Sequence, residues 1–274
     1  MDEQLYLMAV GLSLKEKVEK AIANLRHYER EALKHNVTGY YLCDSYGKDS
    51  CVILSLARKA GVTFTANHNL TTLDPPELIR FGRKHHPNTI EHRPEKPMLV
   101  RMVERACPPT RLVRWCCAEY KENAGSGVLI FGVRAAESVS RKNNWQVWQK
   151  YRARKESWIL NPILYWSDED VWRYIQNEGL PYCELYDQGF DRLGCIGCPM
   201  ARKKRLTQFE RWPKYEAAWK RAFKKLWDTY HGQLTQRGKV RMIDRMGFTG
   251  WEDYWTWWMS GESGKYDERQ MELF

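Results

Sequence analysis

The chain has 274 residues with a formal net charge of +10, and 43% of its residues are hydrophobic, 28% charged and 13% aromatic. This composition is typical of a folded globular protein and excludes the disordered and fibrous classes. Its apolar runs are far shorter than the roughly 20 residues of a membrane-spanning helix, so no such helix is expected. The N-terminal residues lack the basic region and long apolar core of a secretory signal, which predicts a cytoplasmic location.

The first half of the chain predicts an alternation of helices and strands. Apolar residues at helical spacing indicate an amphipathic helix over residues 12–35. A buried strand at 39–43 and a helix at 49–60 follow, with a glycine-containing loop between them. Further strands are predicted at 62–66, 88–92 and 128–133, and further helices at 75–86 and 97–106. This order predicts an α/β fold, a mainly parallel twisted sheet with helices on both faces and ligands at the carboxyl ends of the strands.

The second half predicts helices and a basic surface. Ser167 is a good N-cap for a helix that ends at Asn177. Beyond Pro199, aromatic residues recur at intervals of three and four, which predicts helices with an aromatic packing face. Between Arg202 and Arg245 there are 14 Lys or Arg residues and four acids, an excess equal to the net charge of the whole chain. Nucleic acid is the expected partner of such a surface, and a solvated helical face is the alternative explanation.

The loop after the first predicted strand has the features of a phosphate site. Residues 45–50 read Ser-Tyr-Gly-Lys-Asp-Ser and lead into a helix. Backbone N–H groups and the positive helix end can therefore surround an anion, while Lys48 supplies a charge. The spacing is not that of a Walker P-loop. The pattern Ser-x-Gly-Lys-Asp-Ser after a first strand resembles instead the pyrophosphate loop of the PP-loop ATP pyrophosphatases.

Three later segments are similar to the phosphoadenosine phosphosulfate (PAPS) reductase family of that superfamily. Residues 132–138 resemble its Gly-x-Arg-x-x-Glu-Ser segment, with Arg141 following. Residues 161–172 resemble its Pro-Leu-x-x-Trp-Thr-x-x-x-Val-Trp segment, and residues 185–189 its Leu-Tyr-x-x-Gly segment. Together with the loop, these motifs cover about residues 39–200.

The resemblance implies binding of ATP with Mg²⁺ and cleavage between its α and β phosphates. Lys48, Asp49 and Arg134 would be the catalytic residues. The reductases of the family usually lack the Lys-Asp pair in this loop, so Lys48 and Asp49 favour ATP cleavage. Asp74 would contact magnesium or ribose, or else only start a helix. The residues expected around the nucleotide are Ser45, Gly47, Lys48, Asp49, Ser50, Asp74, Gly132, Arg134, Glu137, Ser138 and Arg141.

Four of the eight cysteines form two close pairs, Cys116-Cys117 and Cys195-x-x-Cys198. Two ligand pairs from distant segments can hold one metal centre. Adjacent cysteines strain a tetrahedral zinc site, whereas a [4Fe-4S] cluster offers separate irons to neighbouring thiolates. The pattern resembles that of adenylylsulfate (APS) reductases, which implies a [4Fe-4S] cluster on these four cysteines, with zinc and free structural thiols as alternatives. Cys107 could replace Cys117 as fourth ligand, and the thiol left over, or Cys183, would be a sulfur carrier.

The first functional hypothesis is an ATP pyrophosphatase that activates an acceptor, a nucleic acid, for sulfur transfer. An iron-sulfur cluster would assist this transfer, and a protein would be the sulfur donor. A sulfonucleotide reductase that forms sulfite is the second, although no cysteine follows Cys198 to act as its mobile nucleophile. A non-catalytic, nucleotide-sensing DNA-binding regulator is the third. The expected parts are an N-terminal helix over 1–38, a nucleotide-binding and iron-sulfur domain over 39–200, and a basic aromatic helical module over 201–274.

Overall fold

The computed structural model describes residues 3–122, 125–152, 154 and 156–261. The chain forms two compact units. Unit 1 comprises Met1–Asn69, Pro76–His92 and Ala124–Leu193, and unit 2 comprises Leu70–Pro75, Arg93–Asn123 and Gly194–Phe274. Among the described residues, no helix has both the length and the apolar character needed to cross a membrane.

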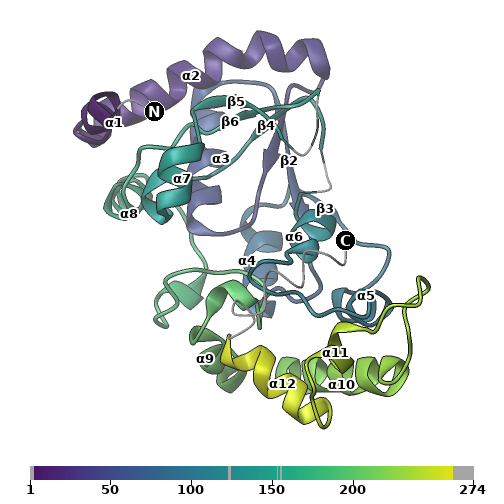
Figure 1. The fold of residues 1–274 in the computed structure, drawn as a ribbon. Helices are drawn as coiled ribbons and strands as arrows, with labels where there is room; N and C mark the ends of the chain where they lie inside the picture. Colours follow the sequence, from purple (N-terminus) through teal and green to yellow (C-terminus); the bar gives the residue numbers. More distant parts are fainter. Residues whose placement is uncertain (1–2, 123–124, 153, 155, 262–274) are drawn as a thin grey trace. The chain divides into compact units, whose positions relative to one another are not determined.

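Unit 1 is built on a six-stranded sheet with the strand order β3-β2-β1-β4-β6-β5 (Figure 1). All neighbouring strands are parallel except β5 and β6, which are antiparallel. The predicted mainly parallel α/β sheet is therefore confirmed. The strands are β1 (Tyr40–Cys43), β2 (Phe64–Asn69), β3 (Ile90–His92), β4 (Val128–Ile130), β5 (Trp148–Lys150) and β6 (Trp158–Leu160).

Three helices cover one face of this sheet. They are α2 (Leu14–His35), α3 (Lys48–Ala60) and α8 (Asp168–Asn177), and their apolar side chains form one buried cluster with those of β1, β4 and β6. Ser13 and Glu16 form a capping box that starts α2. A buried ion pair of 2.6 Å between Lys17 and Asp170 joins α2 to α8. Unit 1 also contains α1 (Glu3–Val10), α4 (Pro76–His85), α7 (Val139–Asn144) and the short helices η1 (Ala135–Glu137) and η2 (Glu184–Tyr186).

The described part of unit 2 is helical. Its aromatic core lies between α9, α10 and α12, where Trp219 packs on Trp258 with ring centroids 4.7 Å apart. The predicted aromatic face of α10 is therefore a packing face, as expected. The helices are α5 (Met98–Glu104), α6 (Trp115–Tyr120), η3 (Pro199–Ala201), α9 (Lys204–Arg211), α10 (Pro213–Tyr230), α11 (Met242–Arg245) and α12 (Trp251–Ser260).

The carboxyl ends of β2, α5 and β4 differ from the predicted boundaries by two or three residues. β2 continues to Asn69 beyond the predicted end at residue 66, because polar side chains of this stretch bond within the sheet: the Asn67 side chain bonds Thr65 and His92. α5 ends at Glu104 because the backbone of Ala106 has a φ of 51°, which a helix cannot adopt. β4 ends at Ile130, three residues before its predicted end.

Candidate functional site

The loop over residues 45–50 is closed by its own serines. Gly47 is the N-cap of α3 in extended conformation, so the positive end of the helix begins at Lys48. The Ser50 hydroxyl accepts the Ser45 N–H at 2.9 Å, and the two hydroxyls are 2.7 Å apart. The Lys48 N–H donates to the Tyr186 hydroxyl at 3.0 Å. The motif thus forms a compact turn at the carboxyl end of β1, where ligands bind in such sheets.

Two cations of this loop region meet at one carboxylate. Lys48 Nζ lies 3.1 Å and Arg134 Nη2 2.9 Å from Asp168 Oδ1. Arg134 Nε also donates to Asp49 Oδ1 at 2.6 Å. The Lys48 and Arg134 side chains are only 7% and 5% exposed, whereas that of Asp168 is 61% exposed. The structure therefore pairs Arg134 with Asp49 and places Lys48 and Arg134 at the same carboxylate oxygen.

The positive charges of Lys48 and Arg134 shift the pKa of Asp168. Burial acts to raise the pKa of its carboxyl, but the hydrogen bond and charge of Lys48, together with Arg134, outweigh it and lower the pKa. Two buried cations thus share an exposed anion that belongs to the protein. A phosphate group of a ligand has the same charge sign and can accept the same hydrogen bonds, so it would compete with Asp168 for them.

Replacing Asp168 by asparagine is expected to raise the affinity for inorganic pyrophosphate about fivefold, because this removes about 1 kcal/mol of competition from a largely exposed ion pair. Calorimetric titration measures the change. Glu169→Gln is the matched control, since Glu169 is an exposed neighbour that pairs only loosely with Arg173 at 3.9 Å. Weaker pyrophosphate binding by the Asp168 variant would instead show that this carboxylate positions the two cations.

The segment after β4 approaches the loop through glycine. A Cβ on Gly132 would lie 3.2–3.4 Å from side-chain and backbone atoms of Asp49, so a larger residue would push the two segments apart. Glu137 accepts the Arg134 N–H at 3.0 Å and pairs with Arg141. Ser138 caps α7 by accepting the Arg141 N–H at 3.2 Å. In this structure Glu137, Ser138 and Arg141 therefore organise the backbone around Arg134.

Asp74 has a local structural role. Its carboxylate accepts the N–H and the hydroxyl of Thr71 at 2.7 Å and 2.8 Å, which fixes the turn after β2. Its backbone carbonyl accepts a hydrogen bond from the Tyr215 hydroxyl at 3.1 Å. Both partners belong to unit 2. Its predicted contact with magnesium or ribose stays a prediction.

All four paired cysteines belong to unit 2. Cys116 and Cys117 lie in α6, and Cys195 and Cys198 flank a tight turn. The turn is fixed by Gln208, which accepts the Gly197 N–H at 2.9 Å, and by Trp219, which donates to the Ile196 carbonyl at 3.1 Å. Gly197 has a φ of 81°, and a Cβ there would lie 2.6 Å from the Trp219 ring nitrogen, so glycine is required.

The four thiols are close enough to affect one another electrostatically. A hydrogen bond from Cys116, followed by one from Arg114, lowers the pKa of Cys117 to about 5 against the opposing effect of burial. The same Cys116–Cys117 bond, with burial, raises the pKa of Cys116, and the charges of Cys195 and Cys198 add to that rise. The nearby charge of Cys195 also raises the pKa of the Lys121 ammonium.

Cys107 has a different environment. Burial raises the pKa of its thiol to about 12, and among the described residues it is the charge of Arg105 that opposes this rise. Its own charge acts on Tyr254, whose pKa is raised mainly by burial. These surroundings favour Cys117 over Cys107 as the fourth member of the cysteine set. Within the described ranges, no three His, Cys, Asp or Glu side chains form a group that could hold a single metal ion.

The sequence patterns did not single out two residues of the loop site. In the sequence pattern Asp168 is an acid in the first turn of a helix, which the helix dipole already explains, although it lies in the segment over residues 161–172. Tyr186 lies in the Leu-Tyr-x-x-Gly segment, and its hydroxyl approaches Gly47 closely, since a Cβ there would be 3.3 Å away. Their positions in these two motifs are the sequence signal that could have identified them as residues of the loop site.

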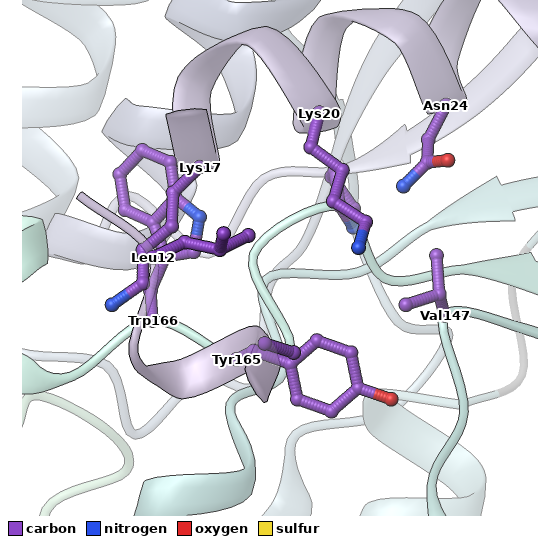
Figure 2. A pocket seen from close by; sticks show the side chains of 9 residues that line it. Leu12, Lys17, Lys20, Asn24, Val147, Tyr165 and Trp166 are labelled. Carbon is purple, nitrogen blue, oxygen red and sulfur yellow. The ribbon is translucent and has the colours of Figure 1, made fainter. Parts of the chain in front are cut away.

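A separate hollow in unit 1 lies beside the start of α2 (Figure 2). Figure 2 shows Lys20, Val147 and Tyr165 bordering it, with the Lys17 ammonium directed away from Lys20. Lys17 is held by Asp170. None of the residues predicted to bind the nucleotide lines this hollow, which is bordered by Ala9, Leu12, Lys17, Lys20, Asn24, Val147, Pro162, Tyr165 and Trp166.

Comparison with known proteins identifies relatives of this chain. A family model described as phosphoadenosine phosphosulfate reductase domain matches residues 40–201. Adenosine 5'-phosphosulfate reductases of Staphylococcus epidermidis and Oceanobacillus iheyensis are 31% and 32% identical to the chain, over 58% of it and over 69% and 70% of their own lengths. An uncharacterised protein of Methanocaldococcus jannaschii is 30% identical over 54% of the chain. The chain spans 30% of that protein and 47% of a second one from the same organism.

Among solved structures, the phosphate complex of phosphoadenylyl-sulfate reductase from Candida auris has a TM-score of 0.47 and 18% identity. The match covers 72% of this chain and 94% of that one. The FMN adenylyltransferase of Candida glabrata in complex with ATP has a TM-score of 0.46 and 16% identity, covering 70% of this chain and 68% of that one.

Proposed function

The chain belongs to the phosphoadenosine phosphosulfate reductase domain family of the PP-loop superfamily, and we propose that it cleaves ATP to AMP and pyrophosphate in order to activate an acceptor for sulfur transfer. In this reaction the acceptor attacks the α phosphate, pyrophosphate leaves, and a sulfur nucleophile then displaces AMP. The observation that carries the proposal is the pair of buried cations, Lys48 and Arg134, held at the start of α3.

Each group of the loop has a role in this reaction. Lys48 and the amides at the α3 N-terminus would stabilise the charge that develops on the leaving pyrophosphate. Arg134, aligned by Asp49 at 2.6 Å, would hold phosphate oxygens in a fixed direction. Mg²⁺ would be bound mainly by the phosphates and water, as is usual at nucleotide sites. Release of pyrophosphate from ATP tests this reaction directly and separates an enzyme from a nucleotide-sensing regulator.

We propose that the paired cysteines hold an iron-sulfur centre. Cys116, Cys117, Cys195 and Cys198 supply four thiols that influence one another electrostatically, and Lys121 beside them adds a positive charge that offsets thiolates. A bound [4Fe-4S] cluster would supply one-electron redox chemistry at this place in unit 2. Zinc is the alternative occupant, but it would require the thiols to move closer together, since no three of them in the described ranges form a group that could hold a single metal ion.

The acceptor that we propose is a nucleic acid, bound by the exposed side of α10. Two lysines of this helix already have acidic partners within it: Lys220 pairs with Glu216 at 2.7 Å, and Lys224 pairs with Asp228 at 2.6 Å. These pairs reduce the charge that those lysines offer to a partner. Three exposed cations of α10 form no ion pair with any described residue: Lys214, Arg221 and Lys225.

Reversing the charges of Lys214, Arg221 and Lys225 to glutamate is expected to weaken binding of duplex nucleic acid and to flatten its dependence on salt, because the logarithmic slope is about 0.9 per phosphate contact. Binding titrations at several salt concentrations measure both quantities. The matched control exchanges the charges of one internal pair, Glu216→Lys with Lys220→Glu, and leaves the net charge unchanged. If the triple variant binds as wild type does, or wild type does not bind at low salt, α10 is not a nucleic-acid surface.

A second candidate function is reduction of a sulfonucleotide to sulfite. The identity of 31% to the Staphylococcus epidermidis adenosine 5'-phosphosulfate reductase favours it. The same buried cations can hold the phosphate and sulfate of such a nucleotide. Incubation with adenylyl sulfate and a thiol reductant distinguishes the two functions, since sulfite forms only if the chain is a reductase, whereas pyrophosphate forms from ATP only if it is a pyrophosphatase.

A further inference from the structure

A buried histidine outside the sequence motifs links both ends of the phosphate loop. His86 follows α4, and its side chain is 4% exposed. Its Nδ1 lies 2.6 Å from Oδ2 of Asp44, the residue before the loop. Its Nε2 lies 3.7 Å from Sγ of Cys51, the residue after the loop. Since a carboxylate only accepts hydrogen bonds, Nδ1 carries the hydrogen, and in neutral His86 the other nitrogen accepts from the Cys51 thiol.

Asp44 connects this histidine to the loop backbone. Its Oδ1 accepts the Tyr46 N–H at 2.9 Å, and its Oδ2 also accepts from the Thr89 hydroxyl at 2.9 Å. The Asp44 side chain is fully buried. A buried carboxylate needs such hydrogen bonds, and it orients the groups that provide them.

Tyr46 is held in an unfavourable backbone conformation by its side chain. Its φ is 61°, in the left-handed region that non-glycine residues rarely adopt. The ring is 1% exposed and stacks on His68 with centroids 4.0 Å apart and an interplanar angle of 11°. It also meets His86 edge to face at 5.7 Å. Gly82 leaves space for the ring, because a Cβ there would lie 2.3–2.5 Å from it.

We propose that His86 and Tyr46 are positioning residues that hold the phosphate loop in its binding conformation before a nucleotide arrives. His86 fixes the two ends of the loop to each other through Asp44 and Cys51, and the buried Tyr46 ring anchors the loop between them. This inference rests on the proposed function for its effect on nucleotide binding, but the order of the loop itself can be measured without a nucleotide.

The test compares adjacent histidines. His86→Ala is expected to weaken binding of ATP with Mg²⁺ and of inorganic pyrophosphate about tenfold or more, a ratio equivalent to about 1.4 kcal/mol. His85→Ala is the matched control, because His85 stacks on Phe81 at 5.0 Å and bonds neither end of the loop. Tyr46→Gly should weaken the binding of both probes about as much as His86→Ala does. Tyr46→Phe keeps the ring and should bind both probes as wild type does. Turnover should show a raised KM for ATP with little change in kcat.

Hydrogen exchange at the amides of residues 45–50 is measured in parallel without nucleotide. Faster exchange in His86→Ala than in His85→Ala supports the inference, and equal exchange in the two variants overturns it. If the wild type binds neither ATP nor pyrophosphate, the proposed function fails, and the exchange result alone decides the inference. Equal affinities for both probes in the His86 and His85 variants would also overturn it.

Discussion

Lys48→Ala is expected to lower the rate of pyrophosphate release from ATP by about 10²- to 10³-fold, the usual cost of removing one preorganised group that stabilises developing charge. The Lys48 side chain is 7% exposed and points at a position now occupied by a carboxylate oxygen of Asp168, 3.1 Å away. Its charge is therefore partly removed from water, where it acts more strongly on a departing phosphate.

The fold is expected to survive this substitution. Asp168 keeps Arg134 as a partner at 2.9 Å, and its side chain is 61% exposed, so no buried carboxylate is left alone. Thermal unfolding should then shift by only a few degrees. Lys59→Ala is the matched control, because Lys59 lies at the other end of α3 and pairs with Glu178 at 2.5 Å. Equal turnover by the Lys48 variant and wild type would exclude the proposed role of this lysine.

The sheet could be predicted because its central strands carry strong signals. β1 and β4 are short apolar runs followed by glycine-containing turns, and the chain alternates between strand and helix. β5 and β6 have three residues each, too few for a period to be recognised, and their tryptophans fit a helix or a strand equally. α6 and α12 were not predicted, because six and ten residues are too few to show a clear amphipathic stripe.

The loop site could be predicted only in part from motifs. Lys48 and Asp49 are adjacent in sequence, and Arg134 belongs to a motif of its own, so all three could be named before the structure was known. Their catalytic roles stay predictions. The position of Asp168 could not be deduced, because an acid in the first turn of a helix is already explained by the helix dipole. That it accepts from both buried cations emerges only from the tertiary structure.

The four thiols proposed to hold a cluster are the second place where one substitution should have a large effect. Cys195 is buried, and its thiol donates to the Thr71 hydroxyl at 3.4 Å. Burial is the main cause that raises the pKa of this thiol, and Lys121 opposes it. A buried thiol next to a cation is well suited to bind an electropositive centre, because metal binding replaces the proton that burial otherwise retains.

Cys195→Ser is therefore expected to remove most of the iron and sulfide from anaerobically purified protein, together with a broad visible absorption that dithionite bleaches in wild type. Loss of an outer-shell partner alone commonly lowers metal affinity about 10- to 100-fold, and loss of a direct ligand should cost at least as much.

Cys107→Ser is the matched control, because Cys107 is also a thiol of unit 2 but is influenced by Arg105 and not by the four paired cysteines. Iron retained in the Cys107 variant and lost in Cys117→Ser would identify Cys117 as the fourth ligand. Stoichiometric zinc without sulfide in wild type would contradict the iron-sulfur proposal, because the thiols would then hold a metal that has no redox chemistry.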